Sequence, residues 1–163
     1  MRNKKVLFVA QAALIAAIYV VLTYFVSAFH LASGAIQIRI SEALTVLPMF
    51  TPAAIPGLAI GCFLSNLLTG CLPMDVFFGS LATFIGAVGS YLLRKHKWLV
   101  PLPPVVANVM IVPYVLAYVY GAEGTIPFFM VTVGIGEVIS CYVLGSVLMN
   151  ALLPYRNILF KND

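Results

Sequence analysis

The sequence predicts an all-α integral membrane protein, built as a compact bundle of six transmembrane helices. Of its 163 residues, 63% are hydrophobic and only 9% are charged, whereas a soluble domain carries about 25% charged residues. The mean hydropathy is +1.08. The apolar residues form long runs, and because a membrane-spanning helix takes about 20 residues, the chain has room for roughly six spans joined by short turns.

Six apolar segments predict a single membrane domain over residues 1–163. The first follows a basic N-terminus, but its apolar run of about 24 residues exceeds the roughly 7–15 of a signal peptide, so we expect it to be retained. The second is too short to cross alone and is expected to be a short, tilted or partly re-entrant helix. The expected spans are 6–29, 40–51, 53–69, 75–93, 99–120 and 125–153.

The basic residues predict the orientation of the bundle. Cytoplasmic loops of membrane proteins are enriched in Lys and Arg. If the N-terminus is cytoplasmic, only Arg39 of the 9 basic residues falls outside. We therefore expect a multi-pass protein of the plasma membrane with both termini in the cytoplasm. The residues expected inside are Arg2, Lys4, Lys5, Arg94, Lys95, Lys97, Arg156 and Lys161.

The motifs and the charge pattern exclude several function classes. The basic residues flank apolar runs, which fits membrane orientation better than a nucleic-acid partner. The sequence contains no HExxH, GxSxG, Walker lysine loop or Gly-rich dinucleotide turn, so we expect no enzyme activity, no catalytic residue and no cofactor. Cys62, Cys71 and Cys141 form no CxxC pair, and their apolar neighbours favour small core residues over a disulfide or metal site.

Glu137 is the first candidate for a ligand site, because an ionisable group at membrane depth is costly unless it is paired or lines a wet cavity. Counting about 1.5 Å per residue from Ile126 places Glu137 roughly 16 Å below the outer boundary, near the midplane. The same count from Tyr120 puts Asn108 roughly 18 Å deep. The two side chains either join their helices through a hydrogen bond or form part of a ligand site.

Other polar side chains are expected above that level, whereas the inner half of the spans holds almost none apart from hydroxyls. This pattern predicts a pocket that opens outward and is sealed inward, and it argues against a channel. Arg39 and Glu42, three residues apart, either line the pocket or form a structural ion pair at a helix end. The outer candidates for substrate binding are Gln37, Arg39, Glu42, Asn66, Asp75 and Tyr118.

The first span carries two overlapping AxxxA pairs, made by Ala12, Ala13, Ala16 and Ala17. Small side chains at this spacing let another helix approach closely. The face is used either for packing inside the bundle or for contact with a partner protein.

Three segments resemble the QueT group of substrate-binding (S) subunits of energy-coupling factor transporters, which is assigned to the uptake of queuosine precursors. The resemblance runs from about residue 6 to 153. Its most specific parts are the R-I-S-E-A-L and G-E-V-I-S-C-Y sequences. The segments are QIRISEALTVLPMFTPAAIPGLAIGCFLSNLL at 37–68, FFGSLATFIGA at 77–87 and VGIGEVISCYVLG at 133–145.

The resemblance implies a non-enzymatic binding subunit that works with a transmembrane coupling subunit and two cytoplasmic ATPases. The alanine face would then contact the coupling subunit. The implied substrate is a 7-deazaguanine such as preQ1, preQ0 or queuine, whose two-donor edge suits a buried carboxylate such as Glu137, with Asn108 beside it. The alternatives are an S subunit for another small vitamin or purine, and a structural or assembly membrane protein.

The orientation is testable by cysteine accessibility in intact cells. A cysteine placed at position 123, in the loop expected outside, should react with a membrane-impermeant reagent, and one placed at position 96 should react only after permeabilisation. Labelling of position 96 in sealed cells would show that the orientation is the opposite of the predicted one.

Overall fold

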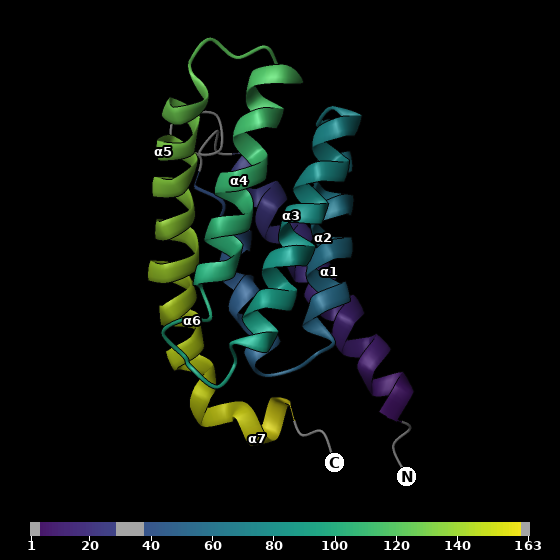
Figure 1. Cartoon of the computed structure of the whole chain (residues 1–163). Coiled ribbons are helices and arrows are strands. Elements are labelled where there is room, and N and C mark those ends of the chain that lie inside the picture. The colour runs from purple at the N-terminus through teal and green to yellow at the C-terminus, as the bar shows by residue number, and fades with distance from the viewer. Residues whose placement is uncertain (1–3, 29–37, 161–163) are drawn as a thin grey trace.

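The computed structural model describes residues 4–28 and 38–160, and every regular element within these ranges is helical (Figure 1). The predicted all-α fold is confirmed. Two elements, η1 and η3, are 3₁₀ helices, and a third, η2, is a π-helix continuous with its α-helical neighbours. In chain order the elements are α1 (Lys4–Ala28), η1 (Ile40–Met49), α2 (Ala54–Leu68), α3 (Pro73–Leu92), α4 (Leu102–Tyr118), α5 (Ile126–Glu137), η2 (Val138–Leu144), α6 (Gly145–Leu152), η3 (Leu153–Tyr155) and α7 (Arg156–Leu159).

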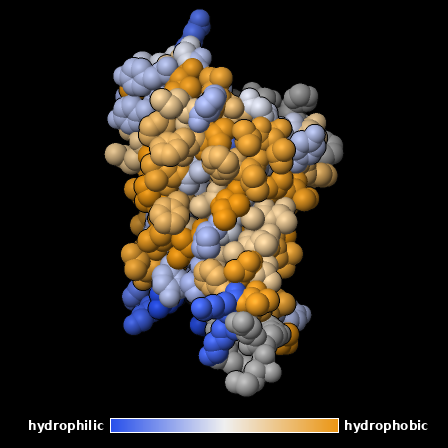
Figure 2. Space-filling model, turned by 90° about the vertical axis from the view of Figure 1, so that its right-hand side faces the viewer, coloured by the Kyte–Doolittle hydropathy of each residue, from blue (hydrophilic) through white to orange (hydrophobic). Residues whose placement is uncertain are grey.

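The elements run back and forth along one axis, so that α7 and the start of α1 lie at the same end of the bundle (Figure 1). The loop between α4 and α5 lies at the opposite end. Among the described residues, three helical stretches are long and apolar enough to cross a membrane, namely Lys4–Ala28, Pro73–Leu92 and Ile126–Leu159. The other apolar helices are shorter. Orange, apolar side chains cover the middle of the face shown in Figure 2, with blue, polar ones gathered at its two ends.

The short second segment forms the centre of the bundle. Its side chains are buried from Ser41 to Pro48, and η1 packs against α1, α2, α3, η2 and α6. At about 2.0 Å per residue, a 3₁₀ helix of this length spans roughly 20 Å, less than the ~30 Å hydrocarbon core. The expectation of a short irregular helix is met by a helix enclosed within the protein.

Helices α1 and α2 pack closely because α2 presents two glycines to α1. A Cβ added at Gly57 would lie 2.8 Å from the Ala12 carbonyl oxygen, and one added at Gly61 would lie 3.1 Å from the Cα of Ala16. At Gly61 the added atom would also lie 2.8 Å from the Cβ of Tyr19, so a methyl group at either position forces the helices to shift. The GxxxG motif of the third predicted span therefore serves internal packing.

This contact divides the alanine face. Ala12 and Ala16 are turned toward α2, whereas Ala13 and Ala17 are exposed. The sequence interpretation placed all four on one docking face, because helical periodicity alone cannot show which edge an internal neighbour covers. A docking role remains a prediction, and only Ala13 and Ala17 leave a free surface for it.

The C-terminal segment folds back against the bundle. Phe160 stacks on Phe50, with ring centroids 5.3 Å apart. The Gln11 side-chain amide donates to the Leu159 carbonyl at 3.4 Å. Both contacts hold the end of the described chain beside the turn that leads into α2.

The α1–α2 contact predicts a stability effect. Gly61→Ala should lower the free energy of unfolding in detergent by about 1–3 kcal/mol, because the methyl group overpacks the contact with α1. Gly134→Ala is the matched control, since its added Cβ would meet only Val109 at 3.4 Å. That variant should be neutral or stabilised by up to about 1 kcal/mol, as alanine favours helices. Equal stability of both variants would show that α1 is not seated on Gly61.

Candidate functional site

Three ionisable side chains meet in the interior of the bundle. Glu42 lies in the first turn of η1, Glu137 ends α5, and Cys141 lies in η2. All three are buried, and one ligand atom of each lies within 4.8 Å of those of the others. The Cys141 thiol donates to Glu137 Oε2 at 3.3 Å. We call Glu42, Glu137 and Cys141 the buried triad.

Glu42 is held by hydroxyl groups on two neighbouring helices. The Tyr19 hydroxyl of α1 and the Thr83 hydroxyl of α3 both donate to its Oε1 atom. Its other oxygen, Oε2, is buried and has no hydrogen-bond partner in the described part of the chain. The sequence placed Glu42 at an outer helix end and left Glu137 alone at depth. That interpretation is wrong, because η1 runs inside the protein and brings Glu42 beside Glu137.

Asn108 joins the triad from α4. Its amide lies within interaction distance of the Glu137 carboxyl, as the matching depths predicted. Yet neither its nitrogen nor its oxygen makes a hydrogen bond within the described ranges, although the side chain is fully buried. A buried amide without partners loses its water hydrogen bonds and gains nothing in return. An incoming ligand with both a donor and an acceptor would satisfy it.

The π-helix begins directly after Glu137. Single π turns inside α-helices occur often at functional sites. Here η2 carries Ser140, whose hydroxyl accepts from the Arg39 backbone N–H at 3.2 Å, and Cys141, whose sulfur contacts the Glu42 carbonyl at 3.7 Å. The irregular stretch therefore fits against the equally irregular η1.

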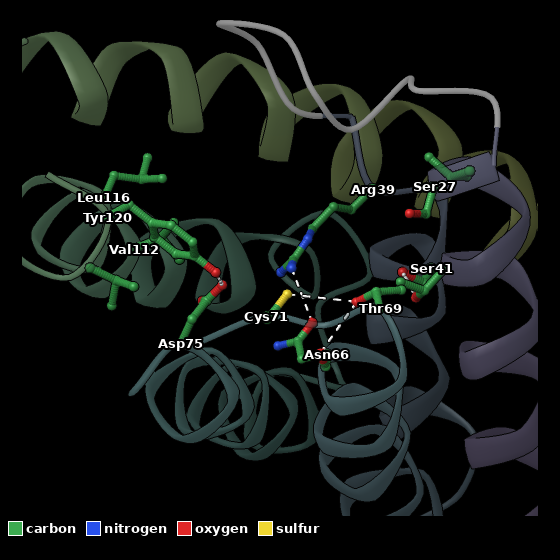
Figure 3. A pocket seen from close by; sticks show the side chains of 13 residues that line it. Ser27, Arg39, Ser41, Asn66, Thr69, Cys71, Asp75, Val112, Leu116 and Tyr120 are labelled. Carbon is green, nitrogen blue, oxygen red and sulfur yellow. Dashed lines mark hydrogen bonds between the residues drawn. The ribbon is translucent and has the colours of Figure 1, made fainter. Parts of the chain in front are cut away.

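A cavity of about 380 Å³ adjoins the triad (Figure 3). Arg39 and Ser41, the residues before and after Ile40, line the cavity, and Ser41 directly precedes Glu42. The Arg39 guanidinium reaches into the cavity and donates to Asn66 Oδ1 at 3.2 Å. The cavity is lined by Thr23, Val26, Ser27, Arg39, Ser41, Asn66, Thr69, Cys71, Asp75, Val112, Val115, Leu116 and Tyr120.

One side of the cavity is closed by a contact between α3 and the segment after α4. The Tyr120 hydroxyl donates to Asp75 Oδ2 at 2.8 Å and accepts from the Leu72 backbone N–H at 3.2 Å. Figure 3 shows these two side chains meeting at the opposite side of the cavity from Ser27 and Ser41. The contact joins the α2–α3 turn to the α4–α5 loop at the end of the bundle away from α7.

Seven of the eight predicted binding residues fall into three groups in the structure. Arg39, Asn66 and Asp75 line the cavity, while Glu42, Glu137 and Asn108 lie in the adjoining interior. Gln37 lies outside the described residues. Their binding roles remain predictions.

Two predicted arrangements differ from the structure. Arg39 donates to Asn66, so the structural ion pair with Glu42 is replaced by attraction without a direct bond. Tyr118 does not line the cavity: it is 77% exposed, stacks on Tyr114 and borders a separate apolar groove between α3 and α4. Its position on α4 turns it toward the lipid side of the helix.

The sequence interpretation missed Tyr19, Thr83 and Tyr120, and took Cys141 as a core residue. A signal for Tyr19 was available, because a tyrosine hydroxyl within an apolar span needs a buried partner. For Tyr120 no signal was available, since its orientation depends on how the chain leaves α4.

Fold and site together define a small helical membrane protein that holds a buried polar site beside a cavity at one end of the bundle. The chain belongs to the QueT transporter family, whose model matches residues 9–154. The Queuosine precursor transporter QueT of Lactococcus lactis subsp. cremoris (strain MG1363) is 34% identical over 98 residues, which cover 60% of this chain and 57% of that relative. No solved structure matches the chain.

Proposed function

We propose that this chain is the substrate-binding subunit of an energy-coupling factor importer and that it binds a queuosine precursor. Membership of the QueT transporter family and the name of the Lactococcus relative support the substrate class. The observation that carries the proposal is a set of buried polar atoms that find no partner in residues 4–28 and 38–160, namely Glu42 Oε2 and both polar atoms of the Asn108 amide. A purely structural bundle gains nothing from leaving these groups unpaired.

The chemistry of a 7-deazaguanine matches this set. Its N1–H and exocyclic amine form a two-donor edge, which a carboxylate accepts through two charge-assisted hydrogen bonds. We assign that edge to Glu137. The Asn108 amide then donates to the adjacent ring carbonyl, and Glu42 Oε2 accepts a further donor on the ligand. PreQ1, preQ0 and queuine share the two-donor edge, so the assignment holds for each.

The cavity supplies a route to this site from one membrane face. Thr69, Cys71 and Tyr120 line it near the turns that lie away from α7 and the start of α1. With both termini in the cytoplasm, that end faces outward. A substrate entering there passes Arg39 and Asn66 before it reaches Glu42 and Glu137. The hydrogen bond between Arg39 and Asn66 must open or shift to admit it.

Transport itself requires partners in this proposal. The chain has no ATP-binding motif of its own, so a transmembrane coupling subunit and two cytoplasmic ATPases provide the energy. The exposed Ala13 and Ala17 give the coupling subunit a surface of small side chains on α1, which lets a partner helix approach closely.

The ligand assignment is tested by Glu137→Gln in the purified chain. Glutamine keeps the shape but places an amide donor against a ligand donor. Losing a charged hydrogen bond and leaving a buried group unpaired costs about 2–4 kcal/mol, or roughly 30- to 1000-fold in affinity. Calorimetry with 7-deazaguanine bases should show this loss, while Glu123→Gln, in the exposed α4–α5 loop, should bind like the wild type. Equal affinities of both folded variants would remove Glu137 from the site.

The docking assignment is tested by tryptophan substitution on α1. Ala13→Trp and Ala17→Trp should reduce co-purification with the coupling subunit and cellular uptake, with substrate affinity of the isolated chain unchanged. Ala16→Trp is the comparison, because Ala16 faces α2 and its substitution should lower the stability of the chain itself. Normal complex formation by both Ala13→Trp and Ala17→Trp would exclude this surface as the contact with the coupling subunit.

A further inference from the structure

The buried triad has the spacing of a metal site. Its ligand atoms lie within 4.8 Å of one another, and Cys141 Sγ is 3.3 Å from Glu137 Oε2. Around a tetrahedral zinc ion, a thiolate sulfur and a carboxylate oxygen are about 3.6 Å apart, given bond lengths of about 2.3 and 2.1 Å. The triad therefore needs a closure of at most roughly 1 Å to take up that geometry.

Buried polar atoms without partners lie in the triad and beside it. Glu42 Oε2 is fully buried and has no hydrogen-bond partner among the described residues, and both polar atoms of the Asn108 amide, which lies near Glu137, are in the same condition. A carboxylate oxygen withdrawn from water without any partner is costly. A cation held by the triad would satisfy the Glu42 carboxylate.

The charges of the neighbourhood also balance with a divalent ion. Arg39 is close enough to attract both Glu42 and Glu137. Two carboxylates and a Cys141 thiolate carry three negative charges, which a divalent ion and Arg39 together neutralise. A neutral cluster is the form that a low-dielectric interior tolerates best.

We propose that Glu42, Glu137 and Cys141 form a binding site for a thiophilic divalent cation of the zinc class. As the metal–sulfur bond forms, the Cys141 thiol proton leaves to water, so that the thiolate becomes the third ligand. The fourth position is open to water or to the Asn108 carbonyl oxygen. The thiolate selects zinc-class ions over Mg²⁺ and Ca²⁺, which prefer oxygen ligands.

This site rests on the geometry and charges of the triad and its neighbours, and it does not depend on the proposed function. Where both hold, the cation and the substrate compete, because they share the carboxylates of Glu42 and Glu137. A site filled by zinc-class ions would then make substrate binding sensitive to these metals.

The experiment titrates Cd²⁺ into the purified, substrate-free full-length chain and follows the ultraviolet thiolate-to-cadmium charge-transfer band. We expect a saturable band that Zn²⁺ displaces and Mg²⁺ does not. Cys141→Ser should abolish the band, whereas Cys71→Ser, which alters the thiol beside the cavity, should retain it. Glu42→Gln should keep the thiol and weaken Cd²⁺ binding at least about 10-fold.

Two outcomes would overturn the proposal. One is a band that survives Cys141→Ser, which would assign the metal to another thiol. The other is the absence of the band in wild-type protein that melts cooperatively and is therefore folded. This result would mean that the triad binds no metal ion. Because Cys141 is buried, the melting temperature of each variant is measured in parallel, and Zn²⁺ should raise it for the wild type and for Cys71→Ser alone.

Discussion

The burial of two carboxylates inside an apolar bundle is the constraint on which the site depends. Ionised groups at this depth require partners or a neutralising ligand, and the chain meets the requirement unevenly. Oε1 of Glu42 receives hydroxyl donors from α1 and α3, whereas Oε2 receives none from the part of the chain that the structure describes. The supply of donors from the protein is thus sufficient to hold Glu42 in place and insufficient to saturate it. A site in this condition is preorganised for whatever completes it.

Irregular helices make this arrangement sterically possible. A long α-helix in place of η1 would cross the membrane and carry its first-turn carboxylate toward the surface. The 3₁₀ helix is short and narrow, so it fits between five neighbouring elements with its side chains buried. On the facing side, the π turn of η2 places Ser140 and Cys141 against the backbone of Arg39 and Glu42. Each irregularity accommodates the other.

Hydropathy and helical rise predicted much of this from the sequence. The apolar runs located all of the main helices, and the rise per residue placed Asn108 level with Glu137. What they could not supply was the tertiary setting. Glu42 was assigned to a helix end because the burial of η1 depends on its neighbours. The alanine face appeared undivided because only the contact with Gly57 and Gly61 of α2 shows that α2 covers Ala12 and Ala16. Tyr118 was expected in the pocket and Tyr120 was not, yet Tyr120 lines the cavity and Tyr118 does not, because α4 ends between them.

The position of η1 also sets an order for biogenesis. Its contacts reach residues of η2 about a hundred positions later, as in the Cys141 contact to the Glu42 carbonyl with a separation of 99 residues. At a synthesis rate of about 5–20 residues per second, the ribosome takes roughly 5–20 s to make that interval. During this time α1 and α2 can already pair through their small side chains, but the central segment has no partner on its other side. The buried triad is therefore completed only after α5 and η2 have been made.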